Sequence, residues 1–190
     1  MDKAADIKKI RHSLEKSQNE KRFHHTLGVA YTATSLAMRY DVDLKKAEIA
    51  GLLHDCARCM DNAKSISFCK KHKISVTEIE RRNPFLLHGK VGSYIARNKF
   101  GIEDEDILNA IFNHTTGRPD MSILEKIVFI ADYIEPSRKV QPHLTEIRKL
   151  AFEDLDGALV WILKDTLEYL DSKKGEIDPM TQKTYDYYCK

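Results

Sequence analysis

Apolar residues recur every three or four positions along nearly the whole chain, which is the spacing of amphipathic helices. No segment shows the strict alternation of apolar and polar residues that is typical of a half-buried strand. The pattern predicts helices over residues 3–17, 21–40, 44–58, 62–72, 75–82, 88–99, 104–115, 121–135 and 143–172, the last with a break near Asp156 and Gly157. We therefore predict an all-α fold, a helical bundle.

Helix-breaking and helix-capping residues support these boundaries. All five prolines fall between the predicted helices. Asn62 and Ser122 stand close to predicted helix starts, and Gly101 and Gly117 follow predicted helix ends.

The chain shows no repeat, low-complexity tract or long linker. We therefore expect residues 1–190 to form a single domain, with a motif-bearing core at about residues 20–140. The helices and tail of residues 143–190 are expected to pack on this core. The tyrosine-rich segment after Gly175 is predicted to be a strap across the bundle.

The composition is that of an ordinary globular protein, with 42% hydrophobic and 32% charged residues among 190. The formal net charge is only +2, and acidic and basic residues are interleaved, so bulk charge indicates no nucleic-acid partner. No apolar stretch approaches the roughly 20 residues of a membrane span. The charged N-terminus lacks the apolar segment of a signal peptide. We expect a cytoplasmic protein with no membrane partner.

The chain has four cysteines, which we expect to be reduced: Cys56, Cys59, Cys69 and Cys189. Cys56 and Cys59 have the CxxC spacing of a zinc or redox pair, but no second pair follows. We interpret the cysteines as small buried residues.

Six side chains that can bind metal extend the apolar faces of five predicted helices: His25, His54, Asp55, His88, His114 and Asp132. In the helix over 44–58, for example, His54 lies seven residues after Ala47 and three after Gly51, the spacing of a buried stripe. A single histidine in such a place is more often a hydrogen-bonded core residue. Six together favour a shared metal centre, because a buried carboxylate needs a cation and the helices of a bundle converge on one core.

The remaining histidines lack this placement. His12, His72 and His143 stand among charged residues or next to a proline, and we expect them to be solvated. His24 lies about 100° round the helix from its neighbour His25, so it is a candidate substrate-binding residue at the rim of the same cleft.

The same residues carry a family resemblance. His25, the His54-Asp55 doublet and Asp132 resemble the H…HD…D signature of HD-domain metal-dependent phosphohydrolases, and His88 and His114 resemble the additions of the two-metal subset. Five longer stretches make the chain similar to the bacterial YqeK family: RFHHTLGV (22–29), GLLHDCAR (51–58), LLHGKVGSYIA (86–96), NHTTGRP (113–119) and ADYIEPSR (131–138). The resemblance implies an HD-domain helical bundle with a central dinuclear metal site. It also implies a hydrolase of phosphoanhydride bonds that splits diadenosine tetraphosphate symmetrically into two ADP.

The resemblance also implies how the metals are shared. Asp55 would bridge two divalent or trivalent ions, with His25, His54 and Asp132 on one and His88 and His114 on the other. Iron is the implied metal, with manganese, cobalt or zinc as substitutes. Four imidazoles and two carboxylates argue against a site for magnesium alone.

A water shared by two cations can act as the nucleophile, so the chemistry requires no serine or cysteine nucleophile. We assign catalytic roles to His54, Asp55 and Arg58. The candidate substrate-binding residues are His24, Arg58, Lys90, Thr115, Thr116 and Arg138. For the three cations a solvated surface position stays open, and for the two threonines an ordinary helix-ending turn.

Alternative functions stay open. The chain could be another HD-type nucleotide hydrolase, acting on mononucleotides or the guanosine alarmone, a di-iron oxygenase, or a non-catalytic nucleotide-binding regulator. Arg58 and Arg138 favour phosphate over oxygen chemistry, and the complete ligand set argues against a regulator. The expected partner is a small-molecule dinucleoside polyphosphate or nucleotide, and a homodimer stays open.

Overall fold

The computed structural model describes residues 6–139 and 141–190, and these contain helices and no strand. The elements are α1 (Ile7–Ser17), α2 (Glu20–Arg39), α3 (Leu44–Leu53), α4 (Asn62–Lys71), α5 (Glu78–Arg82), the 3₁₀ helix η1 (Pro84–Leu87), α6 (His88–Phe100), α7 (Glu105–Asn113), α8 (Ile123–Ile134), α9 (Leu144–Leu150), α10 (Leu155–Ser172) and α11 (Pro179–Tyr188). This confirms the predicted all-α fold. None of the described helices combines the length and the apolar character that a membrane crossing requires.

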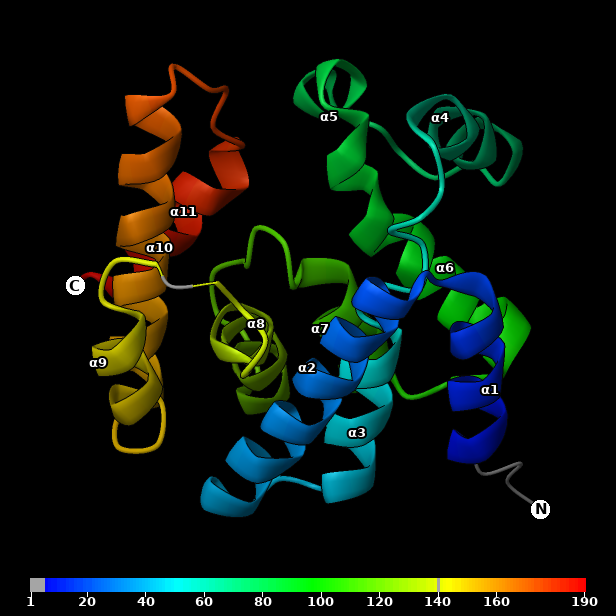
Figure 1. Cartoon of the computed structure of the whole chain (residues 1–190). Helices are drawn as coiled ribbons and strands as arrows, with labels where there is room; N and C mark the ends of the chain where they lie inside the picture. Colours follow the sequence, from blue (N-terminus) through cyan, green and yellow to red (C-terminus); the bar gives the residue numbers. More distant parts are fainter. Residues whose placement is uncertain (1–5, 140) are drawn as a thin grey trace.

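Helices α2, α3, α7 and α8 form the centre of the bundle, and α10 packs on α8 (Figure 1). Helices α2 and α3 approach closely, because a Cβ added to Gly51 would lie 2.7 Å from the Cα of Ala30. Helix α8 is apolar on most of its surface, so it is buried by α2, α7 and α10. This packing fixes the ends of α3, α7 and α8, which carry the predicted metal ligands.

Side-chain caps fix several of these helix ends. Ser122 caps α8 and forms a capping box with Glu125. Gly101 ends α6 with φ +68°, a left-handed conformation that glycine adopts without steric cost. Helix α4 is capped by Asp61, one residue before the predicted Asn62.

Two predicted helix boundaries and the predicted burial of two cysteines were wrong. Helix α3 ends at Leu53 rather than at residue 58, and residues 54–59 form turns. The last predicted helix breaks between α9 and α10, earlier than expected, because Asp154 caps α10 by accepting from the N–H of Gly157. The cysteines are free as expected, but Cys59 and Cys189 are exposed rather than buried.

The segment after Gly175, which we predicted to be a strap, contains helix α11. Its Thr184 is fully buried, and the hydroxyl lies 3.2 Å from the carbonyl oxygen of Thr116. The hydroxyl of Tyr188 accepts a hydrogen bond from the N–H of Met121 at 2.7 Å. The C-terminal helix therefore packs against the loop between α7 and α8.

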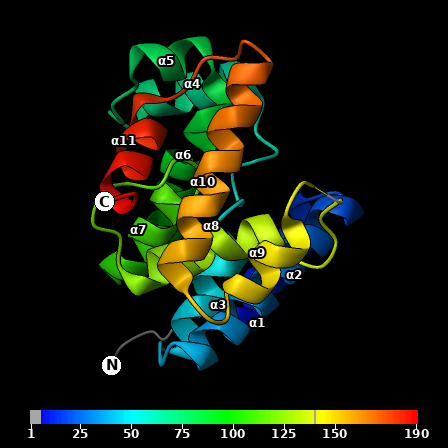
Figure 2. The same ribbon diagram turned by 90° about the vertical axis from the view of Figure 1, so that its left-hand side faces the viewer.

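A second contact joins the C-terminal part to the α4–α5 region, which has its own small apolar cluster. Glu176 accepts from Arg82 Nε at 2.7 Å and from Asn83 Nδ2 at 2.6 Å. In Figure 2 the segment before α11 runs beside α5. The two regions are therefore linked on the side away from α2 and α3.

Candidate metal centre

The structure brings all six predicted metal ligands together. They come from α2 (His25), the turn after α3 (His54 and Asp55), the start of α6 (His88), the end of α7 (His114) and α8 (Asp132). In each of three overlapping groups the ligand atoms lie within 4.8 Å of one another: His25, His54 and Asp55; His54, His114 and Asp132; Asp55, His88 and His114. The cluster is buried except for Asp132, which is half-buried.

Asp55 lies between two sets of imidazoles. Its Oδ2 atom is 3.8 Å from His25 Nε2 and 3.5 Å from His54 Nε2. Its Oδ1 atom is 3.3 Å from His88 Nε2 and 3.7 Å from His114 Nε2. One carboxylate therefore presents one oxygen to each set, which is the arrangement that a bridging ligand requires.

Asp132 belongs to the first of these sets. Its Oδ1 atom lies 3.0 Å from His25 Nε2 and 3.8 Å from His54 Nε2. The donors thus divide into a group of two histidines with Asp132 and a group of two histidines, and Asp55 faces both.

Hydrogen bonds fix the tautomer of all four imidazoles. Three donate the Nδ1 proton to the main-chain carbonyl three residues earlier: His54 to Gly51 (2.7 Å), His88 to Phe85 (2.5 Å) and His114 to Ile111 (2.7 Å). A carbonyl oxygen can only accept, so the proton is on Nδ1 and the lone pair is on Nε2. In His25 the Nδ1 atom donates instead to Glu135 Oε1, at 3.0 Å.

The four Nε2 atoms therefore converge as electron-pair donors, and they fit metal ions. Those of His25 and His54 are buried and have no hydrogen-bond partner. Those of His88 and His114 lie 3.0 Å apart, although neither carries a proton to share. Burial and the neighbouring His114 lower the pKa of His88 to about 3, so this imidazole is neutral. Such facing lone pairs are stabilised by a cation between them.

Both aspartates are ionised and can therefore act as ligands. Burial alone would raise the pKa of Asp55, but His54 and His114 outweigh it and hold the pKa well below its usual value. Burial opposes ionisation of Asp132 in the same way, and the neighbouring His25 and the charge of Arg138 lower its pKa. Two carboxylates with four imidazoles make a nitrogen-rich donor set, which suits divalent transition metals.

Glu135 is a site residue that the sequence analysis missed. It is only 1% exposed, yet its carboxylate accepts from His25 and, at 2.7 Å each, from the N–H and hydroxyl of Ser137. Burial raises the pKa of Glu135, and these hydrogen bonds more than offset it and lower the pKa. Gly28 makes room for it, because an added Cβ there would lie 2.5 Å from Oε2.

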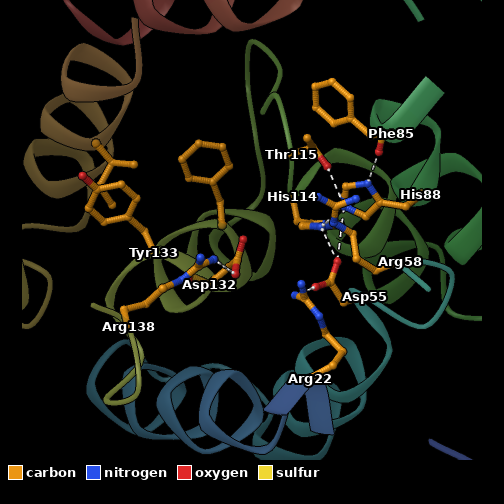
Figure 3. Close-up of a pocket in the computed structure, with 12 residues that line it drawn as sticks. Arg22, Asp55, Arg58, Phe85, His88, His114, Thr115, Asp132, Tyr133 and Arg138 are labelled. Carbon is orange, nitrogen blue, oxygen red and sulfur yellow. Dashed lines mark hydrogen bonds and ion pairs between the residues drawn. The ribbon is translucent and has the colours of Figure 1, made fainter. Parts of the chain in front are cut away.

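A cavity of about 250 Å³ opens over the cluster (Figure 3). Asp55, His88, His114 and Asp132 form its floor, and three arginines line it: Arg22, Arg58 and Arg138. Figure 3 shows Phe85 and Arg58 on one side of the cavity and Tyr133 and Arg138 on the other. Cations and aromatic rings around a metal centre suit a ligand that is both anionic and aromatic.

Three of the predicted substrate-binding residues line this cavity. Arg58 lies beside Phe85, with its guanidinium 6.0 Å from the ring centre. Arg138 donates to the side chain and the carbonyl of Asp132. The hydroxyl of Thr115 lies 3.4 Å from His88 Nε2.

The other three predicted substrate-binding residues do not line the cavity. Lys90 is paired with Glu80 at 2.8 Å and also donates to a main-chain carbonyl. The hydroxyl of Thr116 donates to the carbonyl of Gly117, and His24 is exposed.

Arg22, also missed from the sequence, contacts the floor of the cavity directly. Its Nη1 atom lies 2.6 Å from Asp55 Oδ2. Arg22 stands three residues before His25, and Phe85 stands three residues before His88. A search one helical turn from each ligand would have found both residues.

Comparison with known proteins supports the geometry. The "HD domain" family model matches residues 22–137. "Bis(5'-nucleosyl)-tetraphosphatase, symmetrical" of Bacillus subtilis (strain 168) is 42% identical over 168 residues, covering 88% of this chain and 89% of that protein. A Halalkalibacterium halodurans protein of the same name is 44% identical over 167 residues, 88% of each chain. A crystal structure from Clostridium acetobutylicum, described as a "predicted HD superfamily hydrolase involved in NAD metabolism", has a TM-score of 0.94 and 43% identity, covering 97% of both chains.

An all-α bundle that closes round a buried histidine–aspartate cluster, with an HD-domain match over most of its length, defines the class of protein. The chain belongs to the HD-domain family and, within it, to the family of bacterial relatives named symmetrical bis(5'-nucleosyl)-tetraphosphatases. The family resemblance seen in the sequence is confirmed.

Proposed function

We propose that this protein hydrolyses diadenosine tetraphosphate symmetrically, breaking the central phosphoanhydride bond to give two ADP. The names of its full-length relatives support this substrate. One observation carries the proposal: the two carboxylate oxygens of Asp55 face two separate pairs of imidazoles. Asp55 also lines a cavity that contains three arginines.

We propose further that the cluster holds two metal ions, with iron as the first candidate and manganese, cobalt or zinc as substitutes. His25, His54 and Asp132 would hold one, His88 and His114 the other, and Asp55 both. Bound there, the ions would supply Lewis-acid charge and a water of lowered pKa for attack at phosphorus. The nitrogen-rich donor set supports a transition metal over magnesium.

The surrounding side chains have distinct proposed roles. Arg58 offers a planar set of N–H donors that matches two phosphate oxygens, and it would balance charge that develops on the central phosphates. Arg22, Arg138 and the hydroxyl of Thr115 would bind and orient the remaining phosphates. His54 and Asp55 contribute to catalysis as fixed ligands. Roles for His24, Lys90 and Thr116 would require contacts with a substrate that extends beyond the cavity.

The products of the reaction test the proposal. Diadenosine tetraphosphate incubated anaerobically with the iron-loaded protein should yield ADP alone on ion-exchange chromatography. A mixture of ATP and AMP would rule out symmetric cleavage, and an unchanged substrate would rule out the activity. The same assay on mononucleotides and the guanosine alarmone separates the alternative HD-type hydrolases. A cytoplasmic location and a homodimer stay predictions.

A further inference from the structure

A second cavity, of about 490 Å³, adjoins the metal centre on the side of the α2 start. Its walls are the first turn of α2 and the segment that follows α8, and His25 and Glu135 face it. Arg22 and Arg138 line both this cavity and the one over the cluster, so the two cavities adjoin at these side chains. Figure 3 places these two arginines on the side of the cluster away from Phe85.

The charge of this second cavity is strongly positive. Four cations line it: Lys21, Arg22, Arg138 and Lys139. Its single carboxylate, Glu135, is already engaged by His25 and Ser137. Among the ion pairs of the described residues, Arg22 is used by Asp55 and Arg138 by Asp132, and none uses Lys21 or Lys139. The two lysines are exposed and free to bind an anion.

The chemistry of the lining limits what the cavity can recognise. Among the described residues that line it, the one aromatic ring is the imidazole of His25, which is already engaged by Glu135 and the predicted metal cluster, and the other uncharged residues are Asn19, Ser137 and Gln141. Lysines and short polar side chains bind phosphate oxygens, whereas a base requires an aromatic face or an apolar slot. The cavity over the cluster has such faces in Phe85 and Tyr133.

We infer that this cavity, which we call the basic arm, binds the phosphates of one half of the substrate and leaves the attached nucleoside in solvent. The inference rests on the proposed function. The two halves of a chemically symmetric molecule are then held differently, one by charge and the other by charge together with aromatic rings. A tetraphosphate that carries a nucleoside at one end only is a substrate as well. Water adds across the central phosphoanhydride bond of adenosine 5'-tetraphosphate, which gives ADP and pyrophosphate.

The first test removes the two free cations. In Lys21→Ala/Lys139→Ala the KM for diadenosine tetraphosphate should rise about fivefold to tenfold, because each exposed ion pair contributes modestly, while kcat stays within about twofold. The conservative variant Lys21→Arg/Lys139→Arg should keep the KM of the wild type. The matched control is Lys70→Ala/Lys71→Ala, which removes the same charge from the exposed end of α4 and should leave KM unchanged. All variants are compared at one ionic strength and with equal metal content.

An unchanged KM in Lys21→Ala/Lys139→Ala, or an equal rise in the control pair, overturns the inference.

The second test compares two substrates of the wild-type protein. The kcat/KM for adenosine 5'-tetraphosphate should lie within about tenfold of that for the dinucleotide, because a larger loss would reveal a stacked second base. If the wild type fails to release ADP from the dinucleotide, the proposed function fails. If the wild type releases ADP but the KM of Lys21→Ala/Lys139→Ala is unchanged, the inference about the basic arm fails and the proposed function stands.

Discussion

The Nδ1 atom of His25 lies 3.0 Å from Oε1 of Glu135, and of the four predicted ligand histidines His25 is the one whose Nδ1 bonds a side chain rather than the main chain. Such outer carboxylates raise the basicity of the imidazole and fix its ring. In Glu135→Gln we therefore expect metal affinity to fall by about tenfold to a hundredfold. Competition with a chelator, followed by elemental analysis, measures this loss.

Glu125 provides the matched control, because it is also 1% exposed and carries a buried carboxylate. Its partners are Arg118, at 2.6 Å, and Asn113, at 2.8 Å, and neither is a predicted metal ligand. Glu125→Gln should lower thermal stability and leave metal affinity intact. Equal metal loss in both variants would mean that the effect of Glu135 is only structural.

A substitution at Gly28 also tests the contact between Glu135 and His25, because Gly28 packs against the Glu135 carboxylate. A methyl group at this position would meet Oε2 of Glu135 at 2.5 Å, so the carboxylate must move. In Gly28→Ala we expect weaker metal binding, although α2 keeps or gains helix propensity by about 1 kcal/mol. A chelator titration with circular dichroism separates the two effects. Wild-type metal affinity in this variant would contradict the role of Glu135.

Removal of Asp55 should cost both metal ions, since its two oxygens face both groups of imidazoles. Asp55→Ala should therefore retain no metal and show no turnover. His88→Ala removes a donor of one group only and should retain about one ion per chain, because coordination is lost at one of two sites. Metal-to-protein ratios after gel filtration check both. Retention of two ions in Asp55→Ala would exclude a bridging role.

Arg58 should act on the substrate and not on the metals, because it lines the cavity and, among the described residues, forms no hydrogen bond or ion pair with a predicted ligand. We expect Arg58→Ala to lower kcat/KM by about tenfold to a hundredfold, the loss of a charge-assisted phosphate contact of 1.5–3 kcal/mol or so. Arg58→Lys should recover only part of the rate because an ammonium group lacks the paired donors. The metal content of both variants should match that of the wild type. A lower metal content would mean that Arg58 helps to maintain the metal centre.

The pH dependence of stability should reveal the ion pair between Lys46 Nζ and Asp104 Oδ2, which lie 2.7 Å apart. Burial would raise the pKa of Asp104, but the bond from Lys46 and the N–H groups of Ile107 and Asp106 outweigh it and lower the pKa. Because the folded-state pKa lies below the unfolded value, the pair stabilises the fold above the unfolded pKa. This stabilisation is lost as pH falls through the folded-state pKa.

Replacing Lys46 by Gln should accordingly cost less than about 1 kcal/mol near neutral pH, since both side chains are partly exposed. The difference from the wild type should vanish below the folded-state pKa of Asp104. Urea unfolding at several pH values measures it. Lys45→Gln, at the exposed neighbouring position, serves as the control. A difference that persists unchanged in acid would show that Lys46 stabilises the fold in some other way.

Helical periodicity identified the six candidate ligands that the structure brings together, because each stands one or two turns from small or apolar residues of a buried face. His54 follows Gly51 by three residues, and the close approach of Gly51 to Ala30 brings that face against α2. Periodicity could not reveal which side chains contact the ligands. Arg22 and Glu135 each lie one turn from a ligand, and both read as ordinary surface charges without the fold.

The direction of a side chain round its helix explains why Lys90, a predicted substrate-binding residue, does not line the cavity. Lys90 follows His88 by two residues, which turns it about 200° round α6 and away from the cluster. It meets Glu80 there. We predicted the helix break near Asp156 and Gly157, yet Asp154 accepts from the N–H of Gly157 and keeps this glycine inside the first turn of α10. A cap formed by a neighbouring side chain thus outweighed the weak propensity of glycine.

The main-chain carbonyls of Gly51, Phe85 and Ile111 orient three of the imidazoles, and this orientation does not depend on the side chains at those positions. Any substitution at those positions changes a side chain and leaves the carbonyl acceptor where it is, as long as the turn keeps its shape. Neutral substitutions around the pocket therefore leave the orientation of three of the four imidazoles unchanged. The fourth ring, His25, depends on the side chain at position 135, so substitutions there can change its orientation and basicity while every predicted ligand is kept.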